Sequence, residues 1–220
     1  MAVVSVIVPT NERTALLMGR CLPSIVAQTF TDWEALVVGE PGSPETIDAM
    51  ATVTDPRISF SSVPRPPYPD DPLDAWAISW YAAVAYGFDH AQGEWVTILC
   101  DDDELRPRCF ETLLGKSDGV DLVYGLSERR VGRNAYIMGL DYPPRFDDHV
   151  IGSHIQRRTD SFLRPDPKSI ERGMTPDGEW WQRMFETVPY ARVKQVVHIY
   201  HQALERYHWG PAFYGKEPRP

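Results

Sequence analysis

The sequence predicts an α/β fold in which a mostly parallel sheet is flanked by helices, and three observations support this. Short runs of β-branched and other apolar residues recur through the first half of the 220-residue chain. Segments with apolar residues at helical spacing separate these runs, and each run ends in a loop-forming or acidic cluster. Strands that alternate with helices in this way are typical of sheets buried on both faces.

The first half begins with a run at residues 3–8 that predicts a buried strand with a loop at its carboxyl end. Residues 12–28 have helical spacing, and Pro23 is expected to kink or break this helix because proline has no backbone N–H. A strand, a helix with proline at its start and a weak third strand are then expected at residues 33–38, 44–51 and 58–60. Residues 64–72 contain five prolines and predict an irregular loop.

The longest helix is expected at residues 73–91, which are rich in alanine and aromatic residues. The elements expected after it are strand 95–100, helix 107–114, strands 120–126 and 149–156, helix 177–186 and strand 193–200. Residues 210–220 have little to pack against and are expected to be peripheral. Because no internal repeat and no long linker divides the chain, a single domain over residues 1–220 is expected.

Composition and charge indicate a globular protein, with 43% hydrophobic and 24% charged residues. No apolar run approaches the roughly 20 residues that span a bilayer, and residues 1–9 lack the basic start of a signal peptide. The cysteines, Cys21, Cys100 and Cys109, have no metal or redox spacing, which favours a reducing cytoplasm. The net charge of −9 argues against non-specific nucleic-acid binding, although it leaves nucleic acid open as an acceptor.

The main candidate site is the triplet Asp101, Asp102 and Asp103, which directly follows the apolar run at residues 95–100. Several carboxylates at the end of a buried strand are costly unless a cation or a set of donors compensates their charge. Oxygen ligands of this kind suit Mg²⁺ or Mn²⁺, which in turn neutralise phosphates. The alternative is a solvated turn at the start of the helix at residues 107–114, where carboxylates are also favoured.

Other polar residues follow neighbouring strands in the same way. Pro9 and Thr10 end the first strand, and Glu40 follows the second. In parallel sheets, ligands bind beyond the carboxyl ends of the strands. We therefore expect these residues and the acidic triplet to face one crevice.

Taken together and in order, several segments resemble family 2 glycosyltransferases. These segments are Val4 to Glu12, Leu22 to Phe30 with Trp33 and Glu34, Gly93 to Leu99 followed by the triplet and Pro107, Asp121 to Gly125, Arg157 with Arg158, and Asp177 to Arg183. The resemblance implies an inverting hexosyltransferase with a GT-A fold, a nucleotide-diphosphate sugar donor, a divalent cation (Mg²⁺ or Mn²⁺) and an acceptor with a hydroxyl group. It further implies a nucleotide-sugar-binding half at residues 1–127 and an acceptor-side half at residues 128–220.

The resemblance also assigns residues on the donor side. Pro9 and Thr10 would border the nucleotide base, with Glu12 of the same motif at the donor site, and Glu40 would bind the base or the ribose. In the triplet, which stands at the position of the DXD motif, Asp103 would ligate the metal, Asp101 would assist it, and Asp102 would contact the ribose or the metal. Arg158, or its neighbour Arg157, would pair with the donor phosphates.

The late acidic motif supplies the catalytic base, which by position is Asp177, with Glu179 as the alternative. Asp177 also fits a helix N-cap, and the two roles are compatible because a cap fixes the carboxylate. Trp180 or Trp181 could stack on a sugar, but each fits the core better, and neighbours on a helix point about 100° apart. A basic surface is the simpler interpretation of Arg129, Arg130 and Arg164.

His198 and His201 lie three apart on a strand-like run and should face opposite sides. For His201, contact with the diphosphate or the metal is one interpretation, and a structural histidine is the simpler one. The sequence departs from the family at Gly39 and Glu40, at Val84 and Ala85 before Gly87, and at Cys100, where acidic residues, Arg-Asn and Asp are common. These departures concern the donor base and sugar more than the chemistry.

Two other functions stay open at this stage, and so does assembly into a homo-oligomer. A binding module that holds a nucleotide sugar without turnover would explain Gly39, Val84 and Ala85. A sugar-nucleotide pyrophosphorylase would need a glycine-rich, basic loop after the first strand, and residues 9–12 do not form one.

Overall fold

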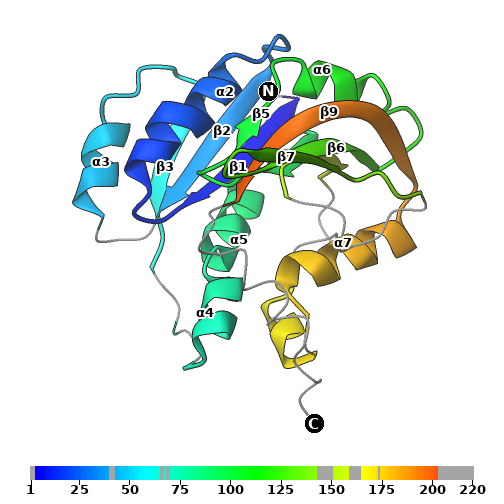
Figure 1. Ribbon diagram of the computed structural model, residues 1–220. Coiled ribbons are helices and arrows are strands. Elements are labelled where there is room, and N and C mark those ends of the chain that lie inside the picture. Colours follow the sequence, from blue (N-terminus) through cyan, green and yellow to red (C-terminus); the bar gives the residue numbers. More distant parts are fainter. Residues whose placement is uncertain are drawn as a thin grey trace.

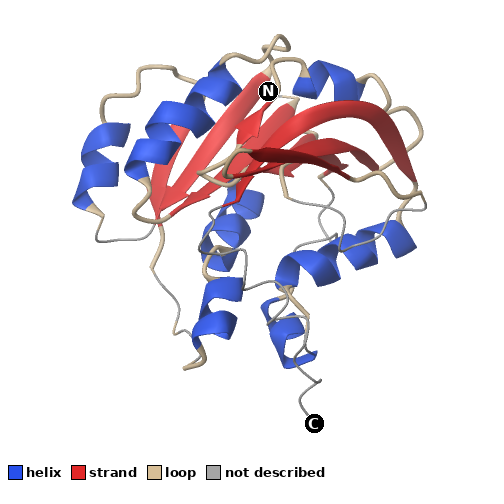
Figure 2. Cartoon of the chain, in the orientation of Figure 1, coloured by secondary structure: helices blue, strands red, loops and turns tan. Residues whose placement is uncertain are grey.

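The computed structural model describes residues 3–39, 43–64, 67, 70–142, 151–158, 165–172 and 174–202. Glu40, Arg164 and the tail at residues 210–220 lie outside these ranges. The described residues form one curved sheet with helices on both of its faces (Figure 1, Figure 2). The predicted α/β architecture is confirmed.

The sheet has nine strands within the described residues. They are β1 (Val4–Thr10), β2 (Trp33–Gly39), β3 (Ile58–Ser62), β4 (Trp95–Ile98), β5 (Glu104–Leu105), β6 (Leu122–Val131), β7 (Asn134–Met138), β8 (His154–Arg157) and β9 (Tyr190–Gln202). Their order is β3-β2-β1-β4-β8-β6-β9-β5, and β7 pairs with β6. Strands β1 to β4 are parallel, as are β6 and β9, whereas β8, β7 and β5 pair antiparallel. The first half of the sheet is therefore the parallel part.

The helices are short. They are α1 (Thr14–Leu16), the π-helical turn η1 (Leu17–Cys21), α2 (Leu22–Val26), α3 (Pro44–Met50), α4 (Pro72–Ile78), α5 (Tyr81–His90), α6 (Cys109–Leu114), the 3₁₀ helix η3 (Pro167–Arg172) and α7 (Pro176–Thr187). The π turn ends two residues before Pro23, which has no N–H to donate to the carbonyl of Gly19. The regular α-helix is thus interrupted by a wider turn near the proline, where the sequence predicts a kink or break.

The single helix predicted at residues 73–91 is wrong, because the chain turns at Ser79 and Trp80 between α4 and α5. Trp80, the N-cap of α5, packs against the apolar cluster that includes Val84 and Phe88 of that helix. Helix α5 then lies directly on β1: a Cβ built at Gly87 would come within 2.4 Å of Cγ2 of Ile7. Only glycine allows this close approach.

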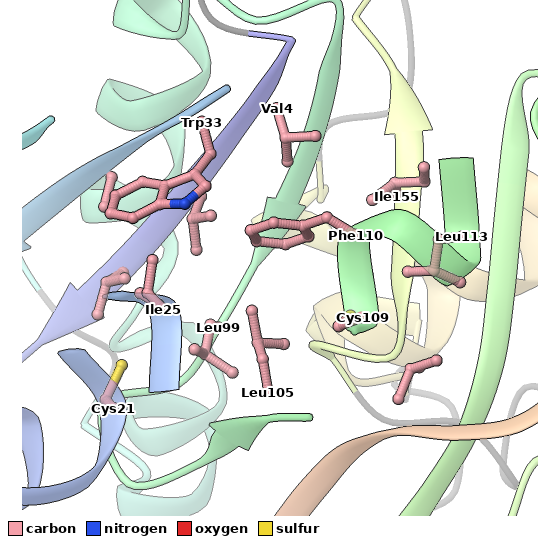
Figure 3. Close-up of a cluster of buried hydrophobic side chains, with 14 of the residues drawn as sticks. Val4, Cys21, Ile25, Trp33, Leu99, Leu105, Cys109, Phe110, Leu113 and Ile155 are labelled. Atoms are coloured by element: carbon pink, nitrogen blue, oxygen red, sulfur yellow. The ribbon is translucent and has the colours of Figure 1, made fainter. Parts of the chain in front are cut away.

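The sheet is covered by apolar clusters on both faces, as the alternation of side chains along β1 requires. Val4, Val6 and Val8 pack against η1, α2 and α6, and Figure 3 shows part of this cluster, including Phe110 of α6. Ile7 faces the other side, where α5 and α7 lie below the sheet in Figure 1. The loop that follows β1 is thus held at the end of a strand that is buried on both faces.

Two of the strands were not predicted. Strand β5 has only two residues, and β7 is largely exposed, so neither shows as an apolar run. Strand β6 runs through residue 127, so the expected division of the chain at that point falls within a strand and stays a prediction. Among the residues placed by the structure, no helix has the length and apolar character to cross a bilayer.

Candidate functional site

The acidic triplet lies at the carboxyl end of β4, beside the end of β1. The two strands are parallel neighbours, and the backbone N–H of Leu99 still donates to the carbonyl of Ile7 at 2.9 Å. The chain after β1 and the chain after β4 therefore leave the sheet together. Thr10 and Asp101 meet there, as the sequence predicts for strand ends at one edge.

Asp101 is bound by the loop after β1. Its carboxylate accepts hydrogen bonds from Thr10 Oγ1 at 2.9 Å, from the backbone N–H of Asn11 at 3.4 Å and from Arg13 Nη1 at 3.1 Å. The residue is 4% exposed. Burial raises the pKa of Asp101 to about 6, against the opposing effects of Arg13 and Thr10. The carboxylate serves mainly to join β4 to the β1 loop.

Asp102 shares the same arginine. Its Oδ2 lies 2.7 Å from Arg13 Nη1, and its backbone carbonyl accepts a hydrogen bond from Arg20 Nη1 at 2.8 Å. Its side chain is 18% exposed, so it faces partly outward. Glu12, in the loop that carries Arg13, has φ of 53°, and among the described non-glycine residues it alone has a positive φ. Such backbone strain is concentrated at functional sites.

Asp103 is the most buried member of the triplet, at 1% exposed. Its Oδ1 accepts the backbone N–H of His201 at 2.8 Å, and its Oδ2 lies 3.4 Å from His198 Nε2. The other ring nitrogen of His198 is 3.1 Å from Ser127 Oγ. Burial raises the pKa of the Asp103 carboxyl, and the nearby His198 opposes that shift. The carboxylate thus depends on contacts from β9, nearly 100 residues away along the chain.

The two histidines of β9 face opposite sides of the strand, as predicted. The His198 ring is fully buried against Asp103, and Gly152, with φ of 103°, lies so close that an added Cβ would be 2.6 Å from its Nε2. The His201 ring instead lies 2.6 Å from Glu104 Oε1. His201 therefore reaches the triplet through its backbone, while its side chain is engaged by the next acidic residue.

A divalent cation fits one part of this cluster. Cys100 Sγ and the carboxylates of Asp102 and Asp103 offer ligand atoms within 4.8 Å of one another. The carboxylates suit Mg²⁺ or Mn²⁺, whereas burial, aided by the three neighbouring carboxylates, raises the pKa of the Cys100 thiol and keeps it neutral. Asp101 is not part of this group. The geometry favours Asp102 rather than Asp101 as the partner of Asp103.

The acidic pair of α7 lies at the start of that helix. Thr175 is the N-cap and its side chain accepts the N–H of Gly178, so Asp177 is in the first turn but is not the cap. No hydrogen bond or ion pair to another described residue holds the half-buried Asp177 carboxylate. Glu179 is bound through both oxygens by Arg183, at 3.1 Å each. Of the two candidate bases, Asp177 is the one left available.

Both tryptophans of α7 are in the core. Trp180 and Trp181 are 0% and 1% exposed and pack with Phe88 and Phe185 in the cluster between α7 and the sheet. Neither forms a surface on which a sugar could stack. The interpretation of one of them as a sugar platform is therefore wrong, and the core interpretation holds for both.

Arg158 lies at the wrong end of β4 for a contact with the donor phosphates. Its Nε donates to the carbonyl of Gly93 at 2.8 Å, before β4 begins, and Arg157 pairs with Glu94 and Asp121. Since β4 is an extended strand, several residues at about 3.3 Å each separate this end from the triplet. This position argues against the predicted contact of Arg158 with the diphosphate, and the assignment stays an untested prediction.

Other predicted residues have simpler outcomes. Pro9 and Thr10 end β1 and are buried beside β2, and Glu12 is exposed in the next loop. The cation that pairs with the carboxylates of Asp101 and Asp102 is Arg13, which is not among the predicted site residues. The rule that ligands meet strand ends could have found it, because it lies three residues beyond the end of β1.

Comparison of sequences links the chain to a glycosyltransferase. The chain is 34% identical over 128 residues to the GalNAc(5)-diNAcBac-PP-undecaprenol beta-1,3-glucosyltransferase of Campylobacter jejuni. The match covers 57% of this chain and 38% of that enzyme, so the chain spans well under half the length of this relative. No protein-family model matches the chain.

Comparison of structures extends over nearly the whole chain. Residues 1–349 of S. aureus TarS superpose with a TM-score of 0.70 at 15% identity, covering 91% of this chain and 60% of that one. The same fragment solved in complex with UDP-GlcNAc gives a TM-score of 0.71 at 14% identity, covering 92% and 59%. Its complex with UDP gives 0.68 at 15% identity, covering 94% and 62%.

These identities are low, so the structural likeness concerns the fold. It agrees with the sequence match to the glucosyltransferase and with the order of the family segments along the chain. The chain therefore has the α/β fold of TarS residues 1–349, as expected for a GT-A domain.

Proposed function

We propose that this chain is an inverting glycosyltransferase that moves a sugar from a nucleotide-diphosphate donor, a UDP-sugar, to an acceptor hydroxyl. One observation carries the proposal: buried carboxylates with raised pKa values gather at the carboxyl end of β4 in a GT-A fold, next to the loop after β1. Buried, perturbed carboxylates in such a place mark a functional site. The UDP-GlcNAc complex of TarS supports a uridine donor.

The donor diphosphate requires positive charge at this edge of the sheet. Asp102 and Asp103 would hold Mg²⁺ or Mn²⁺, with Asp103 fixed by the N–H of His201 and flanked by His198. When bound, the cation neutralises the leaving diphosphate as a Lewis acid. Thr10 and the loop after β1 would border the nucleotide, and the strained backbone at Glu12 is part of that loop. The assignment of Glu40 to the base or ribose stays a prediction.

Asp177 would act as the general base. As the acceptor oxygen attacks the anomeric carbon, the bond from that carbon to the diphosphate breaks and the acceptor proton passes to the Asp177 carboxylate. Attack opposite the leaving group inverts the configuration at that carbon. The carboxylate suits this role because no described side chain occupies it, whereas Arg183 holds Glu179. A positioned base typically contributes about 10²–10⁴-fold to the rate.

The acceptor is proposed only as a hydroxyl-bearing molecule. The relative from Campylobacter jejuni is named for a glycan carried on a diphosphate-polyprenol. A lipid-linked glycan is therefore the first acceptor to test, followed by free oligosaccharides. The cytoplasmic location and assembly into an oligomer stay predictions.

The experiment is a calorimetric titration of the chain with UDP and with UDP-GlcNAc, each with and without MnCl₂, followed by an assay of donor hydrolysis. We expect binding that depends on Mn²⁺ and slow release of UDP with water as acceptor. Metal-dependent binding without turnover on water or on any glycan would favour the non-catalytic binding module. Absence of metal-dependent nucleotide binding would sink the proposal.

A further inference from the structure

Arg13 is the side chain that neutralises the outer part of the acidic cluster. A single guanidinium nitrogen, Nη1, lies 3.1 Å from Asp101 Oδ1 and 2.7 Å from Asp102 Oδ2. Asp102 also belongs to the group of ligand atoms that fits a divalent cation. The Asp102 carboxylate therefore pairs with Arg13 in this structure and is also one of the candidate metal ligands.

These two uses of Asp102 compete. A divalent cation and a guanidinium on one carboxylate would lie within a few ångströms of each other, where like charges repel strongly in a partly buried site. The neighbouring cation Arg20 cannot take over, because it binds the backbone carbonyl of Asp102 and approaches Glu104 at 3.9 Å. A metal ion on Asp102 thus requires Arg13 to withdraw from that carboxylate.

The loop gives Arg13 freedom to withdraw. The residue lies between the strained Glu12 and the first turn of α1, with φ of −115° and ψ of 39°, and its side chain makes no helix-capping hydrogen bond. The side chain is 28% exposed, so part of it already faces solvent. Its contacts to Asp101 and Asp102 are the ones that must change for the guanidinium to turn outward.

We infer that Arg13 is a displaceable counter-ion: it neutralises Asp101 and Asp102 in the donor-free chain, and it moves to the donor diphosphate when a metal ion takes its place on Asp102. The inference rests on the proposed function, because the diphosphate is the anion that arrives with the metal. Arginine pairs well with phosphate oxygens. The consequence is positive coupling, in which UDP strengthens metal binding and the metal strengthens UDP binding equally.

The test is a titration with Mn²⁺, followed by the electron paramagnetic resonance signal of the free ion, for the unmodified chain and for Arg13→Gln, each with and without UDP. Without UDP, Arg13→Gln should bind Mn²⁺ at least about tenfold more tightly, because the competing charge is gone. Addition of UDP should then improve Mn²⁺ affinity far less in Arg13→Gln than in the unmodified chain. Arg106→Gln is the matched control, since Arg106 pairs with Glu128 outside the cluster, and it should behave as the unmodified chain.

Arg13→Lys keeps the charge and guards against a folding defect in Arg13→Gln. It should retain the weak Mn²⁺ binding of the unmodified chain in the absence of UDP, and thermal unfolding of each variant reports the fold. Equal Mn²⁺ affinity in Arg13→Gln and the unmodified chain without UDP would overturn the inference while leaving the proposed function intact. Failure of the unmodified chain to bind Mn²⁺ even with UDP would instead overturn the proposed function as well.

Discussion

The two ends of strand β4 carry charged clusters with opposite properties. At the carboxyl end, Asp101 and Asp103 are 4% and 1% exposed, and burial raises the pKa of both carboxyls. At the amino end, Arg157 pairs with Glu94 and Asp121, whose side chains are 58% and 43% exposed. Buried carboxylates oppose folding unless their charge is compensated, whereas exposed ion pairs change stability little.

This difference separates a ligand site from a structural ion pair. Residues 101–104 bring four carboxyl groups together, and the arginines that contact them in the described part of the chain are Arg13 and Arg20. The carboxyl end of β4 therefore has more carboxylates than arginines and can bind a further cation. At the amino end, the acidic groups are already paired with Arg157. The following predictions test this contrast, from the largest expected effect to the smallest.

Asp103→Asn should abolish the Mn²⁺-dependent part of UDP binding. The substitution removes one of the two carboxylates in the candidate metal group, and an amide oxygen is a weaker ligand for a hard cation. Calorimetry with UDP, with and without MnCl₂, measures the effect. Asp121→Asn makes the same change at the amino end of β4 and should leave both titrations unaltered.

The same variant separates binding from folding. Because burial raises the pKa of Asp103, a neutral asparagine should not lower the thermal stability of the metal-free chain. Metal-dependent UDP binding that survives in Asp103→Asn would assign the cation to other residues.

Asp177→Asn should lower the rate of donor hydrolysis by about 10²–10⁴-fold and leave UDP-sugar affinity unchanged, as expected for loss of a general base. Glu179→Gln is the matched control on the same helix turn. It breaks the contacts with Arg183, an i,i+4 pair, and should cost only about 0.2–0.5 kcal/mol of stability with the rate retained. Full activity in Asp177→Asn, with loss of activity in Glu179→Gln, would reverse the assignment.

The contrast also explains how far the sequence could predict the site. The alternation of apolar runs and helical segments predicts the parallel strands β1, β2 and β4, and strand polarity alone brings Thr10 next to Asp101. The spacing of apolar residues and the direction of each strand follow from neighbouring residues, so both can be predicted from the sequence.

The contacts that divide the triplet are not local. Asp101 and Asp103 have similar sequence surroundings, but one is bound by the loop after β1 and the other by β9. The position of Arg158 was missed for the same reason: β8 pairs antiparallel with β4, which brings its end to the start of β4 rather than to the triplet. Pairing direction in the second half depends on long-range strand order, which no motif in the sequence specifies.

Arg158→Ala should leave UDP and UDP-sugar affinity unchanged, because its guanidinium contacts Gly93 at the amino end of β4. Arg157→Ala, in the same segment, breaks two ion pairs and removes the guanidinium that lies over the Trp95 ring. A modest loss of stability of about 0–1 kcal/mol is expected, again without a change in donor binding. Urea unfolding and calorimetry measure the two effects. A clear loss of donor affinity in Arg158→Ala would show that the amino end of β4 also belongs to the site.

A small effect on stability is expected at Asp55, at the amino-end edge of the sheet before β3. The Arg57 side chain, through its hydrogen bonds to the carboxylate, lowers the pKa of Asp55, the opposite direction to Asp101 and Asp103. A folded-state pKa below the unfolded one adds stability above the unfolded pKa, and that stability is lost as the pH falls through the folded value. Because the pair is partly exposed, solvent screening limits the contribution to a few tenths of a kcal/mol up to about 1 kcal/mol.

Asp55→Asn should therefore be slightly less stable than the unmodified chain at pH 7, and the difference should shrink as the pH falls below about 4, the unfolded pKa of aspartate. Urea unfolding at a series of pH values measures it. A difference that is constant with pH would mean that local packing, or a weaker hydrogen bond from the backbone N–H of Arg57 to the asparagine oxygen, sets the effect rather than charge. A shrinking difference would show that the carboxylate at this edge stabilises the fold through its charge, whereas the buried carboxylates at the opposite edge depend on compensation.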